Sequence, residues 1–182
     1  MPVHRRFTLP PLAALIFGVI VLGVAGCGYS SSSKDVVAGQ TVTLGKLQYT
    51  VVFSRYLNPN DSEDAAFLAG QPPPPPATNY YGVFLQVQNE DSRPHLLPKS
   101  LKITDTIGQV FKAIPSSSVF AMPLGGTVEG EEQEPVLDSP AQQGPIQGSL
   151  VLFRLPAEVS SNRPLTLSIP GSEGPAEVTL DL

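Results

Sequence analysis

The chain has 182 residues and a formal net charge of −5, and charged residues make up 15% of it, against roughly 25% in a typical soluble domain. An acidic chain lacks the dense basic face that phosphate contacts require, which excludes a nucleic-acid-binding protein. One cysteine excludes an internal disulfide, and 20 prolines exclude an all-helical bundle, because each interior proline costs a helix about 3 kcal/mol.

The first predicted element is a cleavable leader over residues 1–26. Arg5 and Arg6 give it a basic start, and Leu12–Gly26 is an uncharged apolar run. This run is shorter than the roughly 20 residues of a membrane-spanning helix and has the length of the apolar region of a secretory signal peptide. We therefore predict that the leader directs export and is then removed. The two arginines leave both the general and the twin-arginine export routes open.

The leader ends in Val24-Ala25-Gly26-Cys27. This segment resembles the bacterial lipobox, in which one aliphatic and two small residues precede a cysteine that accepts lipid. The resemblance implies cleavage between Gly26 and Cys27 and lipid attachment to the Cys27 sulfur, since a thiolate is a strong nucleophile. An uncleaved transmembrane helix is the competing interpretation, and the short run favours the lipobox. Two or three acyl chains on one residue hold a protein on the membrane almost permanently.

A flexible tether is predicted over residues 27–38, because Ser30–Ser33 carries no apolar pattern. Residues 28–38 span roughly 17–20 Å as a flexible coil. The folded domain, predicted at 39–182, is therefore expected to lie close to the membrane surface.

Apolar and polar residues alternate with period two through the folded part, which predicts β-strands. The clearest strand is Lys46–Tyr56, where Leu47, Tyr49, Val51 and Phe53 form the row expected to face the core. Further strands are predicted at Thr41–Leu44, Tyr80–Asn89, Leu101–Thr104, Gln109–Ile114, Ser149–Leu155, Leu165–Ile169 and Val178–Leu182. No amphipathic helix is evident, so the sequence predicts an all-β fold, an antiparallel β-sandwich of about eight strands.

Two predicted loops are unusually long, residues 57–79 and 115–144, and loops beyond about 12–15 residues are usually functional or disordered. Both carry acidic residues, whose oxygen atoms are the ligand type that calcium prefers. These residues lack the spacing and the turn glycine of an EF-hand, so we interpret them as solvated and predict no metal site and no cofactor. They are Asp61, Glu63, Asp64, Glu129, Glu131, Glu132, Glu134 and Asp138.

The first long loop contains Pro72–Pro76, which predicts a stiff polyproline II segment. Pro72, Pro76 and Tyr80 form a candidate contact surface for a protein partner. The competing interpretation, which we favour, is that the prolines stiffen the loop and Tyr81 extends the core row of the following strand.

His95 is the one histidine of the predicted mature chain and the one candidate for a general base. A serine hydrolase needs such a base beside a serine and a carboxylate, but no serine lies in a Gly-x-Ser-x-Gly turn. A single histidine without a free thiol also cannot form a typical zinc site. We predict a non-enzymatic protein, with a hydrolase that uses His95 as the weakest alternative.

Four segments in this order carry a family resemblance: Gly45–Val51, Val83–Asn89, Asp105–Phe111 with its turn glycine, and Gly148–Pro156. Together they resemble the immunoglobulin-like domain of many bacterial lipoproteins and small secreted antigens, typed mainly as a domain of unknown function. The resemblance implies an antiparallel sandwich without the cysteine pair of antibody domains, and it implies no catalytic residues.

These features predict a lipid-anchored protein on the extracytoplasmic face of the cell membrane. We expect a non-enzymatic binding or adaptor module of the cell envelope that acts through its long loops. Its partners are then the membrane, through the lipid on Cys27, and an envelope or extracellular protein. The main alternative is a structural or accessory subunit of an envelope membrane complex that docks through a sheet edge.

Overall fold

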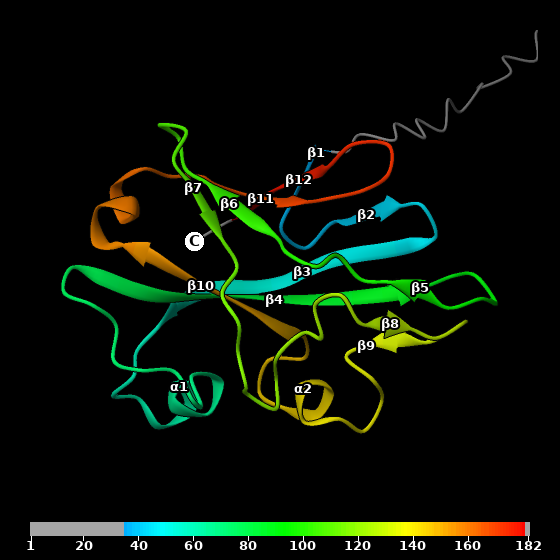
Figure 1. Ribbon diagram of the computed structural model, residues 1–182, viewed down its shortest axis with the longest axis horizontal. Helices are drawn as coiled ribbons and strands as arrows, with labels where there is room; N and C mark the ends of the chain where they lie inside the picture. The colour runs from blue at the N-terminus through cyan, green and yellow to red at the C-terminus, as the bar shows by residue number, and fades with distance from the viewer. Residues whose placement is uncertain (1–34, 181–182) are drawn as a thin grey trace, which may run out of the picture. The chain divides into compact units, whose positions relative to one another are not determined.

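The computed structural model describes residues 35–180, and two facing β-sheets make up most of this part (Figure 1). The leader, Gly26 and Cys27 lie outside the described residues. The strands are β1 Asp35–Val37, β2 Thr41–Leu44, β3 Leu47–Leu57, β4 Thr78–Asn89, β5 His95–Leu96, β6 Lys102–Thr104, β7 Val110–Lys112, β8 Thr127–Val128, β9 Gln133–Glu134, β10 Ser149–Pro156, β11 Leu165–Ile169 and β12 Ala176–Leu180.

The sheets follow two simple orders. Sheet A runs β1-β12-β11-β6-β7, and sheet B runs β10-β4-β3-β2, with β9 added to β4. The two-residue strands β5 and β8 pair separately. Nearly all pairs are antiparallel, as predicted, and β6 and β7 form the hairpin expected around Gly108. Within residues 35–180, no helix has the length and apolar character needed to cross a bilayer.

The main core lies between the two sheets. On β4, the inward row of Tyr81, Val83, Leu85 and Val87 is at most 1% exposed, and it packs into one cluster with the apolar residues of β11. Complete burial of an aliphatic side chain stabilises the fold by about 1.5–3 kcal/mol relative to exposure. The prediction that Tyr81 extends the core row is confirmed.

The prediction that Phe53 faces the core is wrong. The pairing of β3 with β4 shifts between Val51 and Phe53, because Val52 forms a β-bulge. An extra residue turns every later side chain to the opposite face, since strand side chains alternate with period two. Phe53 is therefore 47% exposed, and Ser54 takes the inward position at 4% exposure.

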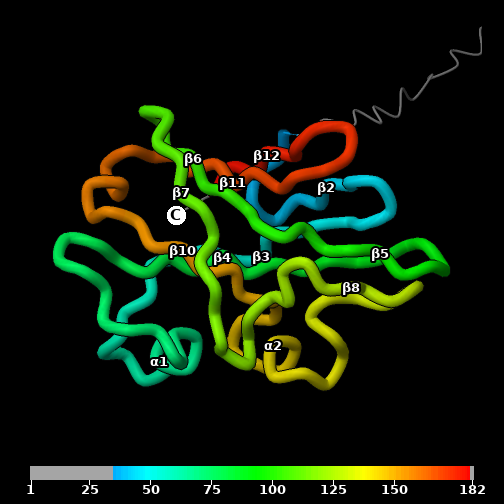
Figure 2. The backbone as a smooth tube through the Cα atoms, viewed as in Figure 1, coloured from blue at the N-terminus to red at the C-terminus, as the bar shows by residue number. Residues whose placement is uncertain are grey.

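The long loops hold helices that the sequence analysis did not predict. Helix α1 (Ser62–Phe67) lies in the first loop and α2 (Pro140–Gln143) in the second, and the 3₁₀ helix η1 (Ala157–Ser161) follows β10. Asp61 caps α1, because its side chain accepts hydrogen bonds from the backbone of Glu63 and Asp64. The two α-helices lie on the side of sheet B away from sheet A (Figure 2).

A second apolar cluster joins these loops to the outer face of sheet B. Phe67 of α1 packs edge to face on Phe84 of β4 and on Phe120, with ring centroids 5.0 and 4.9 Å apart. The loops also bind each other, since Ser118 Oγ donates to the carbonyl of Ala66 at 2.9 Å. The long loops are an ordered third layer rather than free connections.

The folded part begins earlier than predicted. Strand β1 occupies residues assigned to the tether, and it pairs in parallel with β12, Asp35 opposite Glu177 and Val37 opposite Thr179. A three-residue strand next to a serine-rich run gives too short a pattern to recognise in the sequence. Residues 35–37 therefore belong to the folded domain, and this pair departs from the antiparallel prediction.

Candidate functional site

The candidate contact surface around the prolines is only partly exposed. Pro72 and Pro76 are exposed, but Tyr80 is 1% exposed and its hydroxyl donates to the carbonyl of Pro72 at 2.7 Å. The guanidinium of Arg154 lies 5.7 Å from the Tyr80 ring centroid. Burial thus removes Tyr80 from the predicted surface, because its outward row faces the helix layer. Pro72 and Pro76 stay a predicted contact surface.

His95 pairs with a carboxylate. Its Nε2 lies 2.9 Å from Oδ2 of Asp91, and Arg93 lies 3.6 Å from the same oxygen. The hydrogen bond with His95 holds the pKa of Asp91 below its ordinary value. The carboxylate is then ionised at neutral pH, so Nε2 carries the proton of the hydrogen bond. Sequence analysis missed Asp91, although a residue four positions from a candidate base in one short loop is a usable signal.

A buried asparagine shapes the loop that carries this pair. Asn89, at 0% exposure, donates from Nδ2 to the carbonyls of Arg93, Val128 and Glu129. Its Oδ1 accepts from the backbone N–H of Asp91 at 3.0 Å. One side chain therefore joins the loop after β4 to the chain at β8, and it sets the position of Asp91.

His95 lines an open cavity at one end of the sandwich, which we call the end cavity. Its volume is about 530 Å³. Gly171 lets two walls approach, because a Cβ at this position would lie 2.9 Å from Cδ2 of Leu44. The lining comes from the β2–β3 turn, the β5 region and the β11–β12 turn: Leu44, Gly45, Lys46, Leu47, Tyr49, His95, Leu96, Pro98, Pro170, Gly171 and Ser172.

Two hydroxyl groups also line the end cavity, those of Tyr49 and Ser172. Burial raises the pKa of Tyr49 to about 12, so its hydroxyl stays protonated at neutral pH. Ser172 lines the same cavity as His95, but no hydrogen bond joins His95 to a serine within the described part of the chain. The arrangement thus holds two of the three groups of a hydrolytic triad without the contact that activates a serine.

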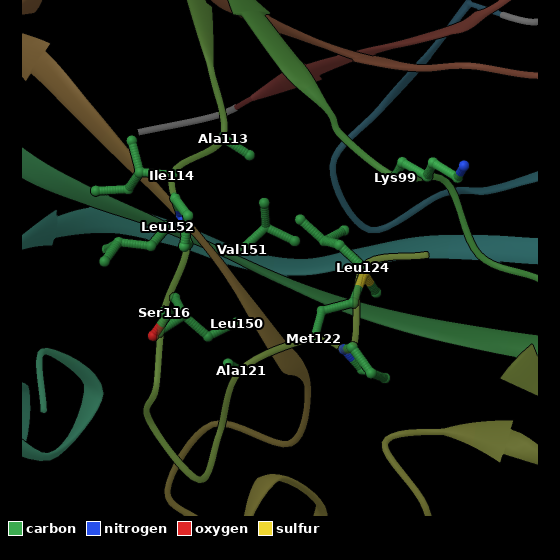
Figure 3. Close-up of a pocket in the computed structure, with 12 residues that line it drawn as sticks. Lys99, Ala113, Ile114, Ser116, Ala121, Met122, Leu124, Leu150, Val151 and Leu152 are labelled. Atoms are coloured by element: carbon green, nitrogen blue, oxygen red, sulfur yellow. The ribbon is translucent and has the colours of Figure 1, made fainter. Parts of the chain in front are cut away.

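A second cavity, which we call the edge slot, lies against β10. Figure 3 shows the segment with Ala113, Ile114 and Ser116 on one side and the segment with Met122 and Leu124 on the other. Its volume is about 410 Å³. The slot is not a free sheet edge, because the N–H groups of Ile114 and Met122 donate to the carbonyls of Leu152 and Leu150, each at 2.8 Å.

The acidic residues do not gather into a site. Among residues 35–180, no three metal-ligating side chains come together. Glu129, Glu131, Glu132 and Asp138 are exposed, whereas Asp64 is 2% exposed and pairs with Arg55. Glu134 is half-buried on β9, where burial raises its pKa and the hydroxyl of Ser149 donates to it.

Comparison with solved structures finds β-sandwich proteins. An uncharacterised β-sandwich protein from Clostridium difficile 630 has 16% identity and a TM-score of 0.51, over 81% of this chain and 93% of that chain. A conserved hypothetical protein from Bacillus anthracis has 12% identity and a TM-score of 0.51, over 78% and 94%. The secreted protein MPT63 from Mycobacterium tuberculosis has 11% identity and a TM-score of 0.45, over 81% and 96%.

No protein-family model matches the sequence, and no similar sequence is found among curated proteins. At identities of 9–16%, the structural likenesses concern the fold alone. Together with the strand pairing, they confirm the predicted class, an all-β sandwich with mostly antiparallel sheets.

Proposed function

We propose that this chain is a lipid-anchored protein of the extracytoplasmic membrane face, with a β-sandwich that acts as a non-enzymatic binding module. The observation that carries the proposal is the segment Val24-Ala25-Gly26-Cys27 at the end of a short apolar run with a basic start. A cysteine at that place becomes the first residue after cleavage, so its sulfur and its amine can both carry acyl chains. One acyl chain gives reversible attachment to a membrane, and two or more acyl chains give stable attachment.

Substitution of Cys27 tests the anchor. We expect Cys27→Ala to leave the precursor uncleaved or to release the protein from membranes, because the variant has no acceptor for lipid. The matched control is Ser32→Ala in the tether, which leaves processing unchanged. Membrane fractionation and the mass of the N-terminal peptide measure the outcome. Full maturation of Cys27→Ala with unchanged membrane attachment would contradict the anchor.

Exposed apolar side chains support binding through the second long loop. Val119, Val136 and Leu137 are 70%, 54% and 62% exposed, and all three lie within residues 115–144. Val136 and Leu137 are consecutive in the chain, and neighbouring large apolar side chains that stay exposed are typical of a protein-binding surface. The partner is then an envelope or extracellular protein, reached within the short distance that the tether allows.

Crosslinking in intact membranes tests this surface. We expect Val136→Ser with Leu137→Ser to reduce capture of the crosslinked partner, because the loop loses its apolar contacts. Val110→Ser, at a 55% exposed position on β7 outside the loop, is the matched control. Equal capture by both variants would contradict binding through this loop and favour docking of an accessory subunit elsewhere on the sandwich.

The pair of His95 and Asp91 is the one observation that favours a hydrolase. His95→Ala tests it, with hydrolysis of a panel of activated esters as the measurement. We expect no difference from the unsubstituted protein, since no serine is hydrogen-bonded to His95 among residues 35–180. Loss of a measurable turnover in His95→Ala would overturn the non-enzymatic proposal.

A further inference from the structure

The chain enters the folded domain at the end that holds the end cavity. Asp35 lies opposite Glu177 on β12, and β12 starts directly after the turn that contributes Pro170, Gly171 and Ser172 to the cavity. Neighbouring strands in a sheet lie about 4.8 Å apart. The first described residue and the cavity therefore share one end of the sandwich.

The length of chain before Asp35 limits the distance from this end to the membrane. Seven residues, 28–34, separate Asp35 from Cys27. A flexible coil of that length spans roughly 13–16 Å, and even a fully extended one spans no more than roughly 25 Å. This step rests on the proposed lipid anchor, and it limits the distance between Asp35 and the leaflet that holds the anchor to the span of these residues.

The lining of the end cavity matches an amphiphilic ligand. Leu44, Leu47, Pro98 and Pro170 contribute apolar surface, and Leu96 is 72% exposed. Binding sites for small molecules have volumes of about 300–1,000 Å³, with mostly apolar walls and a few polar groups that set orientation. A volume of about 530 Å³ falls in that range.

A cationic side chain of the lining matches a phospholipid headgroup. Lys46 lines the cavity and is exposed, and the backbone N–H of Glu90 donates to its carbonyl at 3.1 Å. The Glu90 carboxylate is not part of the lining, because it accepts from Gln48 Nε2 at 2.6 Å, and Gln48 lies with Gln86 and Gln88 on the other face of the sheet. The ammonium group of Lys46 complements the phosphate that phospholipid headgroups share.

We propose that the end cavity binds an acyl chain of a phospholipid from the adjacent leaflet. The phosphate of the headgroup then lies at Lys46. The exposed Leu96 side chain covers the bound acyl chain at the mouth of the cavity. The anchored domain is held with this end on the membrane and its long loops available to a protein partner.

Photolabelling in vesicles tests the inference. The mature lipidated protein is reconstituted into phosphatidylcholine vesicles that contain phosphatidylethanolamine with a photoreactive acyl chain, and labelled peptides are mapped. We expect label on residues 44–47, 95–98 and 170–172. Leu96→Asp should reduce this label about tenfold, because the exposed leucine no longer covers the bound acyl chain. Ile107→Asp, at a 65% exposed position in the β6–β7 turn, is the matched control and keeps the label.

Two further arms separate the alternatives. A phosphatidylglycerol probe with the same acyl chain should label the same residues, because it carries the phosphate that Lys46 complements, and Lys46→Glu should weaken labelling by both probes. Label spread evenly over the surface, unchanged labelling of Lys46→Glu, or unchanged labelling of Leu96→Asp overturns the inference. The mass of the N-terminal peptide reports the anchor separately: a lipidated Cys27 without cavity label overturns this inference alone, and an unlipidated Cys27 overturns both.

Discussion

At the residue scale, the bulge at Val52 exchanges the roles of two neighbours. Ser54 becomes a buried residue, and its Oγ accepts a hydrogen bond from the hydroxyl of Tyr81 at 3.0 Å. Burial raises the pKa of Tyr81 to about 12, so this hydroxyl remains a donor at neutral pH. If a buried hydroxyl loses its hydrogen-bond partner, the free-energy cost of removing it from water is no longer offset.

Removing one partner of this pair should cost more than removing both. We expect Ser54→Ala to lower the free energy of unfolding by about 1–3 kcal/mol, because Tyr81 is left with an unsatisfied hydroxyl. Adding Tyr81→Phe should restore most of the loss. Urea denaturation of the single and double variants measures this. Equal stability of Ser54→Ala and the parent protein would contradict the account.

Glu134 should give the stability a dependence on pH. Its pKa in the folded protein is raised above the ordinary value of 4.5 by burial. The folded state therefore binds this proton more tightly than the unfolded state, and the stabilisation is present below pH 4.5 and lost as pH rises through the raised pKa. Relative to Glu134→Gln, the parent protein should lose stability over that range. Denaturation midpoints from pH 4 to pH 8 test this, and parallel profiles would contradict it.

Residue patterns predicted the faces of most strands but not the exceptions. The row of β4 follows strict alternation, so Tyr81 could be placed in the core from sequence. Phe53 and Tyr80 could not be placed, because a bulge and a covering layer leave no mark on a period-two pattern. In the sequence, nothing indicates that Ser54 rather than the neighbouring Phe53 is the buried residue.

At the element scale, a buried ion pair holds α1 against sheet B. Asp64 is 2% exposed and contacts the guanidinium of Arg55 on β3, and it also accepts from the backbone N–H of Asn58 at 2.7 Å. The capping residue Asp61 and the acidic first turn are helix-start signals. The helix has only six residues, so its apolar pattern is too short to predict a helix from the sequence.

Breaking this pair from one side should detach the helix. We expect Arg55→Met to reduce the free energy of unfolding by about 3 kcal/mol, because it leaves a buried carboxylate without its cation. The double variant with Asp64→Leu should recover much of that loss, since neither charge remains. Urea denaturation provides the measurement. A loss in the double variant equal to that of Arg55→Met would contradict the explanation.

At the scale of the whole molecule, β1 completes sheet A by pairing with the last described strand. Val36 packs against the main core, and Val37 on the opposite face is 42% exposed. Without β1, the outer edge of β12 has no partner within residues 35–180. The first strand is thus part of the domain rather than of the tether.

Two adjacent valines test this assignment. We expect Val36→Asp to destabilise the protein by about 1–3 kcal/mol, because it puts an unpaired carboxylate against the core. Val37→Asp should change stability by less than about 0.5 kcal/mol, as is usual for surface substitutions. Thermal unfolding of both variants distinguishes a paired strand from a flexible tether, for which both substitutions would be neutral.

The candidate site was only partly predictable at this scale. His95 stood out by its rarity, but its cavity joins residues 44–49, 95–98 and 170–172, which are brought together by sheet pairing alone. The sandwich class followed from alternation and turn residues. The third layer could not be predicted from these patterns, because its order depends on contacts between two loops that are far apart in the sequence.

The pairing of β1 with β12 also bears on when the domain can fold. Residues 35–37 meet residues 177–179, so the earliest part of the sandwich to emerge waits for nearly the last before its hydrogen bonds can form. Contacts of such sequence separation slow folding, since a large loop must close first. If a chain is threaded through a membrane pore from its N-terminus, this edge of sheet A stays open until residues 177–179 have passed, and stable closure comes only on the far side.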